Sequence, residues 1–272
     1  GWKYYGSNHI DAHPADTTYS IRQALAVSSN IALARIITEG YGGSAKKFVR
    51  KLERMGVCDS VDYIIPGADQ SKIDIPKDTV TISKMAYGYS VELSPLQMAM
   101  LYNGIANDGK LISPILVENV KKDDEILEEF ESEVIQSSMC SSKTLKEIKS
   151  CLHDVVWDND LGTASVYKWR GHIAKYKAQS QLVAIAGKTG TAQVFENGRY
   201  HGNKHRMSFV GYFPEEAPQY TCICVIHAPR NRGYYDAGMD CGSVVRQIAE
   251  KTMAYSNEYV IDGDELIFRK KQ

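Results

Sequence analysis

A lysine flanked by small and hydroxyl-bearing residues gives the strongest chemical signal in the sequence. The stretch IAGKTGTAQ, residues 185–193, places Lys188 directly before Thr189, Gly190 and Thr191. Two kinds of site use such a combination, a loop that binds phosphates and the inner strand of a serine acyl-transfer site. The two alternatives predict different substrates, so the surrounding residues must decide between them.

The residues before Lys188 do not fit a phosphate-binding loop. That loop needs a glycine six residues before the lysine, and this position is Leu182. The preceding QLVAIA is apolar and partly β-branched, which favours a strand, and the following TAQVFENGRY runs into a turn instead of a helix. The sequence therefore favours the acyl-transfer alternative.

Each residue of Lys-Thr-Gly-Thr has a use in acyl transfer. The ammonium of Lys188 can assist proton transfer at a nucleophile, and the hydroxyls of Thr189 and Thr191 can bind a substrate carboxylate. Gly190 lets a ligand approach the backbone closely. The N–H of Thr191 can stabilise an oxyanion, and the strand can pair with an extended peptide.

A second motif lies between two helical segments near the start of the chain. Ser28-Ser29-Asn30, in AVSSNIALA, is the only Ser-x-Asn of the sequence. On a short turn its hydroxyl can relay a proton and its amide can hold a substrate carbonyl, although a plain helix cap is the alternative interpretation. Together with Lys-Thr-Gly-Thr, the motif indicates a site more specifically than either motif alone.

Composition excludes several other functions. The 272 residues hold 32 basic and 33 acidic side chains, which gives no electrostatic reason to expect nucleic acid or an anionic membrane as partner. The six cysteines show no zinc-type clustering and the seven histidines no HExxH, so we expect neither a metal nor an organic cofactor. Cys222 and Cys224 alternate in YTCICVIH, as small core residues of a strand do.

The elements that must position these motifs can be read from apolar periodicity and turn residues. Helical spacing predicts helices over 16–27, 30–43, 45–56, 94–109 and 142–157, with a closing helix at 240–254. Strand-like segments at 181–195, 205–213 and 219–228 are joined by short links. This order predicts an α/β (α+β) fold with an antiparallel sheet flanked by helices, in one domain over 1–272. The charged stretch 120–133 is expected to be a solvent-exposed excursion of the chain, not a binding tail.

With both motifs in this order, the chain resembles the transpeptidase domain of class B penicillin-binding proteins over residues 1–256. The resemblance is carried by YSIRQALAVSSNIALARI, YGYSVELSPLQMAMLYNGIANDGKLISPILV, AIAGKTGTAQ and MSFVGYFPEE. It implies a β-lactamase/transpeptidase-like fold and a D,D-transpeptidase of the cell-division or elongation type. Such an enzyme cross-links peptidoglycan stem peptides by serine acyl transfer and binds β-lactam antibiotics. It works at the periplasmic face of the membrane, anchored by an N-terminal segment, with cell-wall synthesis or division proteins as partners.

The same resemblance implies roles for individual residues. Ser28 is the proton-relay serine, Asn30 binds the side-chain amide of substrate or antibiotic, and Lys188 is an electrostatic and proton-transfer partner. The implied substrate-binding residues are Ser29, Thr189, Gly190 and Thr191, with the N–H of Thr191 as one oxyanion donor. No cofactor is implied.

The acylated serine of this family lies in a Ser-x-x-Lys motif before Ser-x-Asn. The two matches in this chain, at Ser44 and Ser165, both follow Ser28, and their number is no higher than chance predicts. We expect Ser44 to be a helix cap and Ser165 to lie at a helix end or in a loop, before a long polar connection. We therefore expect 1–272 to be the later part of the domain, without the nucleophile helix and catalytically silent by itself. A serine β-lactamase or β-lactam sensor of the same fold, and a non-catalytic binding module, remain as alternatives.

Overall fold

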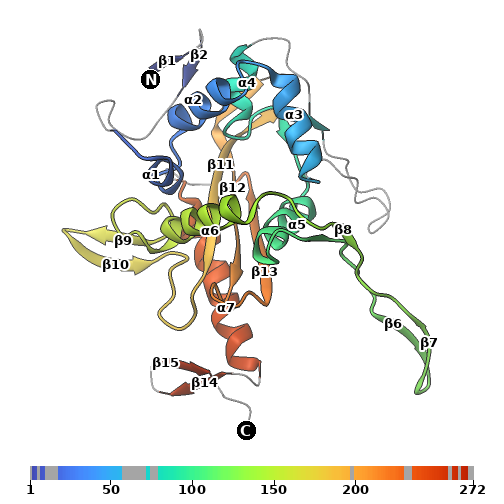
Figure 1. The fold of residues 1–272 in the computed structure, drawn as a ribbon. Helices are drawn as coiled ribbons and strands as arrows, with labels where there is room; N and C mark the ends of the chain where they lie inside the picture. The colour runs from blue at the N-terminus through green and yellow to red at the C-terminus, as the bar shows by residue number, and fades with distance from the viewer. Residues whose placement is uncertain are drawn as a thin grey trace. The chain divides into compact units, whose positions relative to one another are not determined.

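The computed structural model describes residues 2–4, 7–9, 18–56, 72–73, 79–196, 199–229, 235–256, 259–262 and 265–268. The chain divides into two compact units (Figure 1). One unit comprises Gly1–Asp16 and Asn30–Leu145, and the other comprises Thr17–Ser29 and Lys146–Gln272.

The second unit is built on a three-stranded antiparallel sheet. Its strands β11 (Ala186–Glu196), β12 (Arg199–Phe213) and β13 (Tyr220–His227) are paired in chain order, as the sequence predicted. The first strand begins later than expected because residues 181–183 form a turn, in which the Ser180 hydroxyl accepts the N–H groups of Leu182 and Val183. The predicted meander is therefore confirmed, with a shorter first strand.

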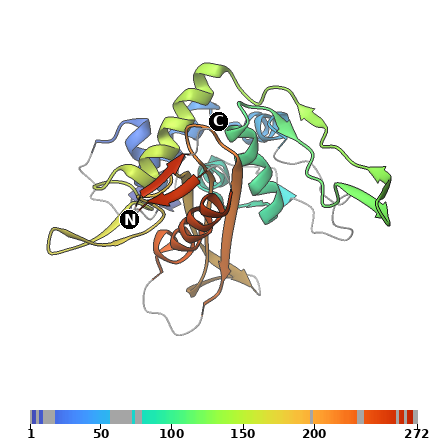
Figure 2. The same ribbon diagram turned by 90° about the horizontal axis from the view of Figure 1, so that it is seen from below.

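Helices cover this sheet and close its core. The helix α7 (Ser243–Tyr255) follows a single π-helical turn, η1 (Gly238–Gly242), and packs on the sheet (Figure 2). The helix α6 (Ser142–Trp157) has the predicted bounds. The fully buried side chains that these elements share include Val155, Ile185, Phe209, Val245 and Met253.

Three further elements complete the second unit. The short helix α1 (Ile21–Ala26) starts at a capping box, in which the side chains of Ser20 and Gln23 each accept from the other residue's backbone N–H. The polar connection expected after Ser165 is instead a hairpin of β9 (Val166–Trp169) and β10 (His172–Tyr176). A second hairpin, β14 (Tyr259–Asp262) and β15 (Glu265–Phe268), follows α7.

The first unit is mainly helical. Its helices are α2 (Asn30–Gly40), α3 (Ala45–Arg54), α4 (Thr79–Met85) and α5 (Pro95–Ala106). Ser44 and Ser94 cap α3 and α5 through their hydroxyls, as the sequence indicated. The sequence did not predict α4, whose TVTISKM is rich in β-branched residues. Packing overrides that low helix propensity, since the fully buried Ile82 joins the core of Phe48 and Val49.

The strands of the first unit form isolated pairs. They are β1 (Trp2–Tyr4) with β2 (Ser7–His9), β3 (Lys72–Ile73) with β4 (Val91–Glu92), β5 (Leu111–Ile112) with β8 (Val134–Gln136), and β6 (Asn119–Lys122) with β7 (Glu125–Glu129). The last of these pairs lies in the charged stretch 120–133, which is exposed as expected but folded as a hairpin.

Among the described residues, no helix is long and apolar enough to span a bilayer. Nor do they contain a group of three or more His, Cys, Asp or Glu side chains that could hold a metal ion.

A close backbone approach in the sheet makes Gly187 the most sensitive glycine of the strand that carries Lys188. A Cβ on Gly187 would lie 2.5 Å from the carbonyl oxygen of Val210 and 2.9 Å from the Cα of Gly211. Backbone cannot yield cheaply, so we expect Gly187→Ala to lower the free energy of unfolding by about 3 kcal/mol. Urea unfolding followed by tryptophan fluorescence measures this change. A Cβ at Gly40 meets no atom within 4 Å, so Gly40→Ala is the matched control, and equal midpoints for the two variants would contradict the prediction.

Candidate active site

Ser28 occupies a strained position at the end of α1. Its N–H donates to the Leu25 carbonyl and the N–H of Ser29 donates to the Ala24 carbonyl, which is the hydrogen-bond pattern of a Schellman C-cap. In that motif the residue with left-handed backbone is usually glycine, yet here Ser28 has a φ of 57°. A non-glycine residue in this conformation costs about 1 to 2 kcal/mol. Strain of this kind is often found at functional positions.

Lys188 projects from β11 to this turn. Its Nζ donates to the Ser28 Oγ at 2.9 Å, and also contacts the carbonyl oxygen of Thr189 at 3.1 Å and its Oγ1 at 3.4 Å. An ammonium has three N–H donors and no acceptor, and here three neutral oxygens lie within hydrogen-bond distance of it. The structure thus brings together the lysine and the serine of the two motifs, which are 160 positions apart.

Burial changes the acidity of this lysine. Desolvation of the ammonium lowers the pKa of Lys188 from 10.5 to about 8. Close to neutral pH the side chain can therefore exist in both its charged and its neutral form. A lysine with that property can exchange a proton with a hydroxyl that it contacts.

The lowered pKa predicts a pH dependence of stability. Between about pH 8 and 10.5 the unfolded chain binds more protons at Lys188 than the folded chain does, so this residue makes stability rise with pH across that window. Urea midpoints of the unmodified protein and of Lys188→Met, compared at pH 7.5 and 10, isolate the contribution of the lysine. We expect the variant to gain less stability on raising the pH. An equal gain in both proteins would contradict the lowered pKa.

A threonine that the sequence analysis missed supports the site. The Oγ1 of Thr163 lies 2.7 Å from the Oγ1 of Thr189, within hydrogen-bond distance. The N–H of Thr163 donates to the Ala26 carbonyl at 3.2 Å, and its own carbonyl accepts from Lys177 Nζ at 3.2 Å. Lys177 in turn forms a largely buried ion pair with Asp236, at 2.8 Å. Thr163 thus links the end of α1 to β11. In the sequence, its position after Gly162 in LGTAS is the only local feature that sets this threonine apart.

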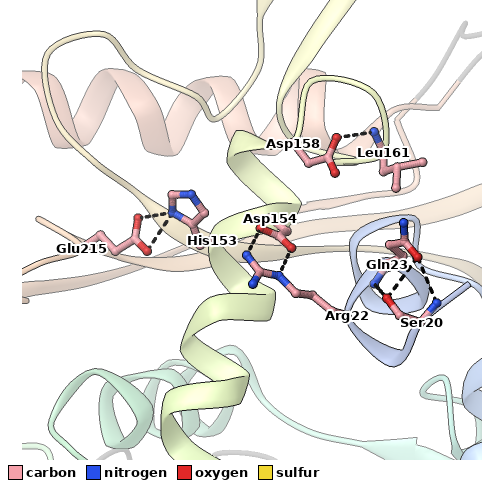
Figure 3. A network of polar contacts seen from close by, with 8 residues as sticks. All are labelled: Ser20, Arg22, Gln23, His153, Asp154, Asp158, Leu161 and Glu215. Carbon is pink, nitrogen blue, oxygen red and sulfur yellow. Dashed lines mark hydrogen bonds and ion pairs between the residues drawn. The ribbon is translucent and has the colours of Figure 1, made fainter.

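The helix α6 makes hydrogen bonds both to α1, which ends before Ser28, and to residues next to the sheet that carries Lys188. Figure 3 shows the bonds of Asp154 and His153. Arg22 on α1 binds Asp154 on α6 through two hydrogen bonds. The Nδ1 of His153 lies 2.9 Å from both carboxylate oxygens of Glu215, just after β12. The indole N–H of Trp157 donates to the carbonyl oxygen of Ile185, the residue before β11. Since α6 contacts both sides, it fixes the distance between the turn and the strand.

The other candidate residues follow Ser28 or Lys188 directly in the chain. Ser29 is buried, with 3% of its surface exposed. Asn30 is the first residue of α2, which belongs to the first unit. A Cβ on Gly190 would lie 2.7 Å from the Ser208 Oγ, so a larger residue here would require the Ser208 side chain to move. Thr191 is exposed on β11. Among the described residues β11 pairs with β12 only, which leaves its other edge able to accept a peptide strand.

Both Ser-x-x-Lys serines make local hydrogen bonds to the backbone. The hydroxyl of Ser44 accepts the N–H of Lys47 as the cap of α3, which confirms the helix-cap interpretation. Ser165 is 1% exposed and donates to the Gly162 carbonyl at 2.9 Å. Its motif lysine, Lys168, pairs with Asp160 at the surface.

Comparison with known proteins identifies the family. A family model described as the penicillin binding protein transpeptidase domain matches residues 1–254. A probable peptidoglycan D,D-transpeptidase PenA of Neisseria meningitidis is 28% identical over 167 residues, which cover 60% of this chain and 24% of that protein. The chain thus spans about a quarter of the length of this curated relative.

Solved structures share the fold. Penicillin-binding protein 2X of Streptococcus thermophilus superposes with a TM-score of 0.73 at 20% identity, covering 88% of this chain and 34% of that one. Penicillin-binding protein 3 of Mycobacterium tuberculosis, complexed with aztreonam, superposes with a TM-score of 0.72 at 21% identity, covering 98% and 58%. The fold and the family match together define a penicillin-binding protein transpeptidase domain. The chain belongs to this family, in its class B branch.

The role of Thr163 can be tested in this setting. Thr163→Val keeps the shape but leaves the Thr189 hydroxyl without this partner, so Thr189 loses one restraint beside Lys188. With the acyl transfer proposed below as the readout, we expect the rate at which a fluorescent penicillin labels the full-length protein to fall about threefold to tenfold, which corresponds to one hydrogen bond. Thr163→Ser, which keeps a hydroxyl, should retain most of the rate. A normal rate in Thr163→Val together with a loss in Thr163→Ser would show that the methyl group, and not the hydrogen bond, matters.

Proposed function

We propose that the protein of which this chain forms part is a peptidoglycan D,D-transpeptidase that acts by serine acyl transfer. The observation that carries the proposal is the 2.9 Å contact between Lys188 Nζ and Ser28 Oγ, which joins the two motifs in one site. The family membership supports the same reaction. The substrates proposed are stem peptides of peptidoglycan, with β-lactam antibiotics as substrate mimics.

The geometry supports a division of roles. Ser28, held by Lys188, relays the proton between the attacking serine and the leaving amine. The charged form of Lys188, with the hydroxyls of Thr189 and Thr191, attracts the substrate carboxylate. A peptide paired along the open edge of β11 would place its carbonyl near the N–H of Thr191, which acts as an oxyanion donor. We propose that Asn30 binds the side-chain amide of the substrate or antibiotic, as the family resemblance implies. The reaction as proposed needs no cofactor.

We further propose that neither Ser44 nor Ser165 is the acylated residue. The Ser44 hydroxyl caps α3 in the first unit and Ser165 is buried, which supports this proposal. The 272-residue polypeptide by itself should then form no stable adduct with benzylpenicillin.

Intact-mass analysis after incubation with benzylpenicillin tests both parts of the proposal. The full-length protein should gain one penicilloyl group, and peptide mapping should place it on a serine three residues before a lysine. A full-length protein that stays unmodified would refute the transpeptidase assignment and favour a non-catalytic binding module. An adduct at Ser44 or Ser165 would refute only the assignment of the nucleophile.

The β-lactamase alternative differs in how fast the acyl group leaves. A transpeptidase holds the penicilloyl ester for a long time, whereas a β-lactamase hydrolyses it with the help of an added glutamate and water. Nitrocefin turnover by the full-length protein separates the two. We expect a single burst without turnover.

The family also supports a location. Curated relatives are cell-wall transpeptidases, such as the peptidoglycan D,D-transpeptidase FtsI of Buchnera aphidicola, 26% identical over 180 residues. We propose that this domain works on the extracytoplasmic face of the membrane, beside other cell-wall synthesis or division proteins. A periplasmic or surface-accessible reporter fused to the full-length protein tests this location.

A further inference from the structure

A two-stranded arm over residues 111–136 extends from the first unit (Figure 1). At its base β5 pairs with β8, and Leu111 is buried in a small core with Met100 and Met139. The side-chain amide of Gln136 donates to the Arg54 carbonyl at 2.6 Å. The base is therefore anchored, and the tip consists of β6 and β7.

The tip is a preformed ribbon. Hydrogen bonds from the Ser113 N–H to the Glu133 carbonyl and from the Phe130 N–H to the Glu118 carbonyl, both 2.8 Å, continue the pairing from the base to the tip. Every residue from 120 to 135 is exposed. No layer of the described chain packs on either face of β6–β7, although a two-stranded hairpin alone is only marginally stable in water.

The exposed side chains of the arm are not those of a solvated loop. The large apolar side chains exposed on it are Leu116, Val117, Val120, Ile126, Leu127, Phe130, Val134 and Ile135. Nearly half of the large apolar side chains that are exposed in the described residues lie between positions 116 and 135. Exposed apolar side chains gathered in one place mark an interaction surface.

The charge of the arm selects the kind of partner. Eight carboxylates, of Glu118, Asp123, Asp124, Glu125, Glu128, Glu129, Glu131 and Glu133, are opposed by two lysines only, Lys121 and Lys122. A second copy of this arm, a nucleic acid and an anionic lipid surface would all be repelled by this excess of negative charge. A surface with lysine or arginine beside apolar side chains is complementary to it.

We propose that residues 116–135 of the arm dock a partner protein that presents a basic and apolar surface. The apolar side chains supply the buried contact area, and the carboxylates steer and orient the partner. This assignment does not depend on the reaction proposed above. It places the interaction on the first unit, whereas Ser28 and Lys188 belong to the second.

Site-specific photo-crosslinking in cells tests the proposal. p-Benzoylphenylalanine is placed at Leu127, 58% exposed on the tip, and in a separate control at Tyr255, 85% exposed on α7. We expect a strong adduct from position 127 only, in which the crosslinked partner peptide is rich in lysine or arginine.

Charge reversal provides the decisive comparison. In the position-127 protein, Glu125→Lys, Glu128→Lys and Glu129→Lys together should lower the adduct yield about fivefold or more. The matched control reverses three exposed acids elsewhere, Glu53→Lys, Glu92→Lys and Glu147→Lys, and should leave the yield unchanged. Unchanged thermal midpoints and fluorescent-penicillin labelling establish that the variants are folded.

Several outcomes would overturn the proposal. The proposal is wrong if position 127 gives no more adduct than position 255, or if the adduct has the mass of two copies of this protein. It is equally wrong if the adduct is to lipid, or if charge reversal on the arm leaves the adduct yield unchanged.

Discussion

Lys188→Met should lower the rate of acylation of the full-length protein by benzylpenicillin by about 100-fold or more, while its thermal midpoint stays equal or rises. The loss follows because Nζ is the donor that holds the Ser28 hydroxyl and supplies positive charge beside it. The stability follows because the ammonium is buried against neutral oxygens, so a methionine of similar length removes a desolvation cost. Stopped-flow or gel-based kinetics with a fluorescent penicillin measure the rate, and calorimetry measures the midpoint.

Lys168 offers a matched control for this experiment. Its side chain is 37% exposed and pairs with Asp160 at the surface. Lys168→Met removes the same charge from the same unit and should leave the acylation rate unchanged. If Lys188→Met folds normally and keeps its rate within about threefold, the role assigned to Lys188 is wrong.

Ser28→Ala and Ser28→Gly should both lower acylation by about 100-fold or more, but they should differ in stability. Both lose the hydroxyl that contacts Lys188. Ser28→Ala keeps the strain of the left-handed backbone, whereas Ser28→Gly relieves it. We therefore expect Ser28→Gly to be about 1 kcal/mol more stable than Ser28→Ala in urea unfolding.

A second serine separates strain from function. Ser90, in the first unit, has a φ of 61°. Ser90→Gly should gain similar stability over Ser90→Ala, and neither change should affect acylation. Equal stability of the glycine and alanine variants at Ser28 would show that the left-handed turn carries no strain. Normal acylation by Ser28→Ala would remove the proton relay from the mechanism.

The proposed roles also explain why a strained serine persists. Glycine fits the end of α1 better than serine does, but it brings no hydroxyl to Lys188. The conformational cost at Ser28 is offset by the core of the second unit. Retaining strain at a reactive group is common in active sites.

The sequence alone determined the features that depend on neighbouring residues. Apolar periodicity and turn residues placed α5 and α6, because these signals act within a few residues. The alternation of apolar residues and the short links predicted the β11–β13 meander. The two motifs identified Ser28 and Lys188 as partners because their residue types have a shared chemistry.

The tertiary structure decided the features that depend on distant contacts. Thr163 became part of the site only through its hydrogen bond to Thr189 across the fold. The low-propensity helix α4 forms because Ile82 is buried by residues far along the chain. The left-handed backbone of Ser28 and the lowered pKa of Lys188 arise from packing around them. Local sequence cannot encode such terms, since burial and close approach are set by segments that meet only when the chain has folded.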